Sequence, residues 1–289
     1  MGNLCCISWS NTYDEIETTQ TLTLERVLTV FLLCFEAAID SLPFYPPVPS
    51  TTRLVSSSSI PSLPSFVTVW EFTRDHSVAP QRSPRSLEAF PAWYRAVHRS
   101  LSRQNLCDHF CLLMDDAVRS KLEELHLGTS RCVRFPPRPL ALYAEIKPDQ
   151  PSPTSHLEKL DEIPPPWHSV LEITTSEGEK LIFDGTPEQF GWNHTGWTMD
   201  KSEIEENYVD GQEEMIEFGE ERKRMVEQYS LIEGLRPWGK IYDRMEELLE
   251  ELDWDSFYGL EDKILWERIR MQAYHKFENV GPLRSEETN

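Results

Sequence analysis

Three residues in the middle of the chain have the types and the order that acyl transfer by a thiol requires. Cys107 heads a stretch with helical periodicity, His168 opens a β-rich stretch, and Asp184 closes the next one sixteen residues later. A helix N-terminus favours a thiolate, because free backbone N–H groups and the helix dipole stabilise negative charge there. A histidine oriented by a third polar group is the usual base for such a nucleophile. The three residues therefore predict a nucleophile, a base and an orienting carboxylate.

The helix that would carry the nucleophile is indicated by its apolar spacing. Apolar residues recur every three or four positions from residue 107 to residue 125, and we expect Gly128 to end this helix. The same reasoning predicts strands over residues 67–72 and 138–146 and helices over 91–103, 202–235, 238–252 and 262–278. An α+β fold follows, with a Cys-bearing helix packed on an antiparallel sheet.

The hairpin that would carry the base and the carboxylate depends on the length of its turn. Side chains alternate along a strand, so His168 and Asp184 share a face only if the loop spans the three residues 176–178. Gly178 is then third in the loop, where a left-handed residue and a bulge are preferred. The sequence therefore predicts that His168 lies beside Asp184 and that Cys107 faces the imidazole from the helix.

Each of these residues also has a structural interpretation or a rival. Free cysteine is among the most buried residue types, so Cys107 could be a small core side chain. Cys111 is a rival nucleophile, but it lies one turn into the helix, where fewer N–H groups are free. Asp184 could simply cap a turn. His109 and His194 are alternative bases, and Gln104 and Gln189 are possible accessory residues.

The stretch Asp184-Gly185-Thr186-Pro187-Glu188-Gln189-Phe190 strengthens this interpretation. With the order Cys107, His168, Asp184, it resembles the papain-like and transglutaminase-like cysteine enzyme superfamily over about residues 100–195. The resemblance implies a papain-like core and a cofactor-free enzyme that acts on the amide bond of a peptide or a small amide. Peptidases, amidases, deamidases and transglutaminases all belong to this superfamily, and the residues favour none of them over the others.

Composition limits the partners and the compartment. The net charge of −21 argues against nucleic acid, whose phosphates attract Lys and Arg, and against anionic membrane surfaces. The six cysteines form no dense framework and no pair has metal-ligand spacing, so we expect reduced thiols in the cytoplasm and no metal. The apolar run over residues 27–35 is too short to cross a bilayer.

The two ends of the chain support different alternatives. We expect residues 1–66 to be largely disordered, with room for one short helix within residues 1–40 and a Pro- and Ser-rich linker over residues 42–66. Residues 67–198 would form the α+β core, and residues 199–289 an acidic helical extension packed on it. One alternative function is a catalytically inactive papain-fold protein that binds a protein partner through the acidic helices. Another is a peripheral membrane protein acylated at Gly2, Cys5 and Cys6.

Overall fold

The computed structural model describes residues 22–42, 45–55, 65–74, 89–146, 167–192, 197–210, 215–218, 224, 236–278 and 280. These residues form an α+β fold with two sheets. The smaller sheet has the order β1-β2-β4, in which β1 and β2 are antiparallel and β2 and β4 are parallel. Its strands are β1 (Arg53–Val55), β2 (Thr68–Phe72) and β4 (Ala141–Glu145). The strand expected over residues 138–146 is therefore present, but outside the larger sheet.

The larger sheet is antiparallel throughout and has the order β7-β6-β5-β3-β8. Its strands are β3 (Gly128–Phe135), β5 (His168–Thr175), β6 (Lys180–Phe183), β7 (Thr198–Asp200) and β8 (Ile216–Glu217). The first six residues of the central strand β5 are all buried, because the sheet is covered on both faces.

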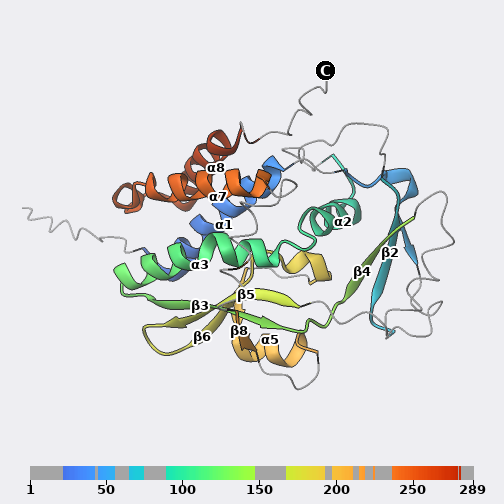
Figure 1. Ribbon diagram of the computed structural model, residues 1–289, viewed down its shortest axis with the longest axis horizontal. Helices are drawn as coiled ribbons and strands as arrows, with labels where there is room; N and C mark the ends of the chain where they lie inside the picture. The colour runs from blue at the N-terminus through green and yellow to red at the C-terminus, as the bar shows by residue number, and fades with distance from the viewer. Residues whose placement is uncertain are drawn as a thin grey trace, which may run out of the picture.

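Helices cover the sheet in unequal layers (Figure 1). Helix α3 (Cys107–Glu124) packs on β3 and β5, while the short α5 (Lys201–Asn207) lies on the opposite side of the sheet. Beyond α3 lie α1 (Leu24–Ser41), α7 (Arg236–Glu250) and α8 (Asp262–Phe277). The remaining helices are α2 (Ala92–Ser102) and the short 3₁₀ turns η1 (Pro49–Thr51), η4 (Pro187–Phe190) and η6 (Trp254–Phe257).

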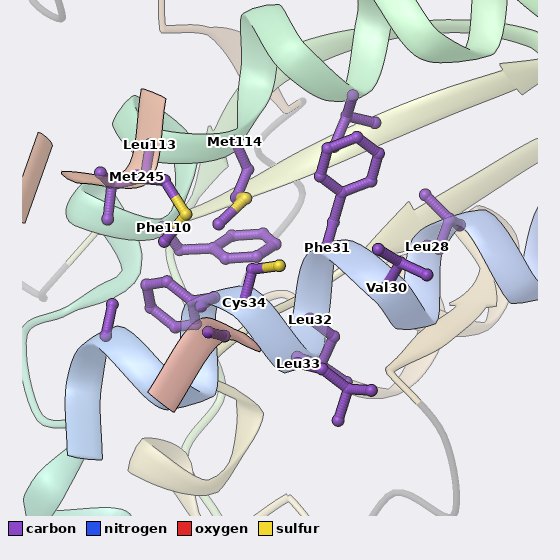
Figure 2. Packing of buried hydrophobic residues seen from close by; sticks show 14 of the residues in the cluster. Leu28, Val30, Phe31, Leu32, Leu33, Cys34, Phe110, Leu113, Met114 and Met245 are labelled. Atoms are coloured by element: carbon purple, nitrogen blue, oxygen red, sulfur yellow. The ribbon is translucent and has the colours of Figure 1, made fainter. Parts of the chain in front are cut away.

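One hydrophobic cluster joins α1, α3, α7, α8 and the facing strands of the larger sheet. Figure 2 shows Phe31 and Cys34 on the side of α1 that faces α3, with Cys34 beside Phe110. The Phe35 ring meets the Phe110 ring edge-on, with 5.0 Å between the centroids. The first helix of the chain is therefore part of the main core.

The expectation that residues 1–66 are largely disordered is wrong for α1. Thr23 caps the helix by accepting a hydrogen bond from the Arg26 N–H at 3.3 Å. Its apolar residues lie on nearly every face, and such a helix is stable only when it is surrounded by other elements. Within the described residues, no helix is long and apolar enough to cross a bilayer.

The prediction of a single helix over residues 202–235 is also wrong. Helix α5 ends at Asn207, and β8 pairs with β3 in the larger sheet. The larger sheet thus includes residues on both sides of the boundary expected at residue 198. The expected helices near residues 238–252 and 262–278 are confirmed as α7 and α8. Both contribute to the cluster shared with α1 and α3.

Gly128 begins a strand rather than ending the preceding helix. Helix α3 stops at Glu124, and His126 takes the left-handed backbone conformation, with φ of 56°. Gly128 is the first residue of β3, with φ of 143°. A Cβ atom there would lie 2.2 Å from the carbonyl oxygen of Thr174, so the close approach of β3 and β5 requires glycine.

Candidate active site

The turn between β5 and β6 brings His168 and Asp184 together. Leu171 pairs with Phe183 and Thr174 with Lys180, so the loop has the three residues 176–178. The Gly178 N–H donates to the Thr175 carbonyl at 3.0 Å, and Gly178 has the left-handed φ of 86°. The predicted turn geometry is confirmed. As a result, His168 Nε2 lies 2.7 Å from Asp184 Oδ2.

The imidazole of His168 is fully buried in a box of aromatic rings. Phe135, Phe190 and Trp192 meet it edge-on, at centroid distances of 5.4, 4.8 and 5.2 Å. Phe135 ends β3, while the other two follow the hairpin, so the box is built from segments far apart in the sequence. The rings exclude water and leave the imidazole little freedom to rotate.

Asp184 is held through both carboxylate oxygens. Its Oδ2 faces His168, and its Oδ1 accepts the Thr186 backbone N–H at 2.8 Å. The next residue is Gly185, where a Cβ atom would lie 2.2 Å from the Phe110 ring. The Asp184-Gly185-Thr186 run therefore has two roles: it fixes the carboxylate and lets α3 approach the hairpin closely.

Cys107 is the first residue of α3, and its thiol acts on the pKa of the same imidazole. The first helical hydrogen bond of α3 runs from the Phe110 N–H to the Leu106 carbonyl, and Leu106 provides no side-chain cap. The N–H groups of residues 107–109 thus precede the helical ladder. The Cys107 Sγ donates to the Trp167 carbonyl at 3.9 Å, and Trp167 is the residue before His168. The Cys107 thiol is also one of the groups that raise the pKa of His168. The thiol is largely buried, with 6% of the residue exposed.

Two neighbouring groups outweigh the effect of burial on the pKa of the imidazole. Burial alone lowers the pKa of His168, because a charged ring is poorly solvated there. The Asp184 carboxylate, by charge and hydrogen bond, and the Cys107 thiol raise it, so that the pKa of His168 is about 10. The site is thus built to stabilise a proton on His168.

Gln189 connects the imidazole to the turn before α3. Its Oε1 accepts the Asn105 N–H at 3.1 Å, and its Nε2 donates to Thr186 Oγ1 at 2.9 Å and lies 3.3 Å from His168 Nδ1. A backbone N–H only donates, so the Asn105 contact fixes which way the amide points. Gln189 therefore directs an N–H group at Nδ1. Gln104, the other accessory candidate, is exposed in the neighbouring turn.

Asp108, next to the thiol, is bound to groups that the sequence analysis did not single out. Its carboxylate accepts the Ser169 hydroxyl and lies 3.6 Å from the Arg134 guanidinium. The Arg134 guanidinium also lies over the Phe218 ring, 4.3 Å from its centroid. These partners come from three separate elements, β3, β5 and α3. The alternation of side chains along each strand is therefore the only local sequence pattern that indicates these contacts.

The rival residues are placed less favourably. Cys111 is fully buried, and both this burial and a hydrogen bond with Cys132 raise the pKa of its thiol well above the usual range. The His109 ring stacks on Trp238 at 3.5 Å, and burial lowers the pKa of His109 to about 4. His194 and the acylation candidates Gly2, Cys5 and Cys6 lie outside the described residues.

Among the residues that the structure describes, no group of three or more His, Cys, Asp or Glu side chains is arranged to hold a metal ion. No family model matches the chain, and neither the curated proteins nor the solved structures include a significant match. The geometry around His168 is therefore the basis for assigning a function.

Proposed function

We propose that the protein is a cysteine-dependent enzyme that hydrolyses an amide bond or transfers its acyl group. Cys107 would be the nucleophile, His168 the base and acid, and Asp184 the orienting group. The observation that carries the proposal is the 2.7 Å contact between His168 Nε2 and Asp184 Oδ2, buried beside a thiol at a helix start. A nucleophile placed beside a base that a third group orients is the signature of covalent catalysis.

The geometry supports a two-stage reaction. Asp184 accepts the Nε2–H of His168, which leaves Nδ1 to take the proton of the Cys107 thiol. The sulfur then attacks the amide carbonyl carbon, and Nδ1–H protonates the departing amine, so that a thioester and a free amine result. Water or a second amine next adds to the thioester, loses its proton to Nδ1, and releases the thiolate, which takes that proton back.

The start of α3 would stabilise the charge that develops on the substrate oxygen. The backbone N–H groups of residues 107–109 point away from the helix body, and the helix dipole adds positive potential there. The nearby carboxylate of Asp108 would oppose this effect, but Arg134 partly offsets its charge. The first turn thus supplies donors for an oxyanion without a metal ion.

Gln189 would act as a positioning residue in this reaction. Its amide N–H favours a lone pair on His168 Nδ1, which is the form of the ring that accepts the thiol proton. This contact opposes the effect of Asp184 and Cys107, which favour the charged ring. A base held between these influences can both take and return a proton during the cycle.

The class of enzyme that fits best is papain-like or transglutaminase-like. Support comes from the chain order of the three residues and from a Cys-bearing helix on an antiparallel sheet. A peptide or small amide substrate and a cytoplasmic location, where thiols stay reduced, belong to the same proposal. The interaction-module alternative is favoured by a separate observation, the groove between α3 and α7 described below.

Limited alkylation of the intact protein tests the thiol chemistry directly. With substoichiometric iodoacetamide at neutral pH, peptide mass spectrometry should find Cys107 labelled ahead of Cys111 and Cys132. Cys111→Ala is the matched control and should leave the Cys107 rate unchanged, whereas His168→Asn should slow it. Equal labelling of the three thiols, or protection of Cys107 until the protein unfolds, would contradict the proposal.

A further inference from the structure

The helix that begins at Cys107 also forms one wall of a groove. The groove has a volume of about 770 Å³ and runs between the C-terminal half of α3 and α7, with α1 behind it. Its floor is apolar, with contributions from α1, α3, α7 and η6: Phe31, Leu112, Leu113, Met245, Leu249 and Trp254. In Figure 1, α7 lies alongside α3 on the side away from the sheet, so the groove and the sheet are on opposite sides of α3.

The rim of the groove is acidic. The lining includes the carboxylates Asp116, Glu124, Glu246 and Glu250 and a single cationic side chain, Lys121. Two of these carboxylates are already paired, Glu124 with Lys121 at 2.5 Å and Asp116 with Arg119 at 2.5 Å. The Lys121 ammonium also lies 4.9 Å from the centre of the Trp254 ring. The carboxylates left to meet a partner are those of Glu246 and Glu250 on α7. Glu246 and Glu250 are exposed and one turn apart on α7, so their charges point the same way.

We infer that this groove binds a basic amphipathic helix of a protein partner. Apolar side chains at i, i+3 or i+4 and i+7 would enter the floor, and Lys or Arg beside them would meet the carboxylates. Between Leu112 and Glu124 the groove wall is about 18 Å long, which corresponds to a helix of about twelve residues. Charge complementarity selects this partner over the other occupants of an apolar groove.

Two of those other occupants are disfavoured by charge. A second copy of the chain would bring another acidic rim and another protein with a net charge of −21 to the same face. An anionic lipid surface would likewise be repelled.

The inference does not depend on the proposed thiol chemistry, but the two would fit together. Leu112 follows Cys107 by five residues, so the nearer end of the groove lies about 7.5 Å along the helix axis from the nucleophile. A helical segment in the groove would therefore bring the adjoining chain of the same partner near the thiol. The groove would then serve as a recognition surface for a basic protein substrate.

A binding measurement with the full chain tests the inference. The probe is a fluorescein-labelled amphipathic helix of about fourteen residues made of Leu, Lys and Ala. A peptide of the same composition with its Leu residues dispersed around the helix is the control probe. Fluorescence anisotropy should show tighter binding of the amphipathic peptide, because only that peptide presents a continuous apolar face.

Charge-reversal variants then locate the binding site. The double variant Glu246→Lys with Glu250→Lys should raise the Kd of the amphipathic peptide about tenfold. Glu203→Lys with Glu206→Lys makes the same charge change on exposed positions of α5, across the sheet, and should have little effect. A third variant, Leu249→Ala, shortens a floor side chain and should weaken binding without changing the charge.

Four results would overturn the inference. Equal affinity for the two peptides, or an equal loss in the α5 variant, would mean that general charge attraction explains the binding. No binding to the wild-type protein would exclude this partner class. A dimer in sedimentation that dissociates on Glu246→Lys with Glu250→Lys would assign the groove to a second copy. Cys107→Ala should bind the peptide normally, so a failure of the catalytic proposal is seen separately.

Discussion

The two ends of α3 are built on opposite principles. At the N-terminal end, polar groups satisfy one another: His168 meets Asp184 and Gln189, and Asp108 meets Ser169. Along the C-terminal half, apolar side chains form the floor of a groove whose acidic rim faces solvent. A single helix thus presents a network fixed by hydrogen-bond direction and a surface defined by shape and charge.

This difference determines what each region tolerates. A buried polar network depends on which atom donates and which accepts, so a change that preserves volume but reverses one donor should disturb it. The apolar core around α1 and α3 depends on volume, so truncation should disturb it instead. The following predictions test that contrast, from the largest expected effect to the smallest.

Cys107→Ala should abolish amide cleavage and acyl transfer, because none of the other described cysteines, Cys34, Cys111 and Cys132, is among the groups that act on His168. The melting temperature should change little, since the side chain is small and the helix start is retained. Turnover of a peptide-amide panel and circular dichroism check the two parts of this prediction. Cys111→Ala is the matched control on the same helix. Turnover retained in Cys107→Ala would show that the N-terminal end of α3 has no catalytic role.

His168→Asn should slow turnover by about 10²–10⁴-fold, the usual contribution of a general acid–base residue. The asparagine amide can still donate to a carboxylate, so part of the network remains. Steady-state kinetics at neutral pH measure the effect, with His98→Asn, a buried histidine on α2, as the comparison. An equal loss in both variants would point to folding rather than to proton transfer.

Phe35→Ala should lower the free energy of unfolding by about 3–5 kcal/mol, as truncation of a fully buried aromatic side chain usually does. Phe35 packs on Phe110 from α1, a helix in the segment that the sequence analysis assigned to disorder. Urea denaturation measures the change, and Leu54→Ala, at an exposed residue of β1, is the control. A loss no larger than that of Leu54→Ala would show that α1 contributes little to the core.

The His168–Asp184 pair should make stability depend on pH in a defined direction. The pKa of His168 is raised to about 10, above the value near 6.5 expected when the chain is unfolded. The stability from this shift is therefore full below about pH 6.5 and is lost as the pH rises toward 10. Asp184→Asn removes the main attraction between the charged imidazole and its surroundings. The unfolding free energy of this variant should therefore fall furthest below that of the wild type near pH 6, and this deficit should shrink toward pH 10.

Urea titrations of wild type and Asp184→Asn at pH 6, 8 and 10 measure that deficit. Asp116→Asn, on the exposed face of α3 at the groove rim, is a control with the same chemical change. A deficit that stays constant across the three pH values would mean that His168 is not charged in the folded protein.

Gln189→Glu should have the smallest effect and is the sharpest test of donor direction. The variant keeps the shape and the acceptor for the Asn105 N–H, but it replaces the N–H directed at His168 Nδ1 with a carboxylate oxygen. The pKa of His168 should rise further, so the pH profile of Cys107 alkylation should move upward by roughly one unit. Gln104→Glu adds the same charge in the neighbouring turn and is the control. Identical profiles for the two variants would leave Gln189 without a positioning role.

Local chemistry was sufficient to predict the elements of the candidate site. The apolar spacing after Cys107 predicts α3, and Gly178 predicts the three-residue turn, because left-handed backbone geometry at that position favours glycine. The length of this turn sets the register of the two strands, and the register predicts that His168 and Asp184 lie side by side. Each of these features involves residues close together in the chain, so the sequence constrains them directly.

Contacts between distant segments could not be predicted in this way. The burial of α1 depends on α3 and α8, and the strand β8 exists only because β3 offers an edge with which to pair. The aromatic box around His168 and the orientation of the Gln189 amide likewise need segments from β3, the α2–α3 turn and η4. The sequence by itself determined which residues have the chemistry and the local geometry for a thiol-centred site. Only the tertiary structure decided which groups surround that site and which helices complete the core, because packing energy comes from neighbours that sequence spacing does not specify.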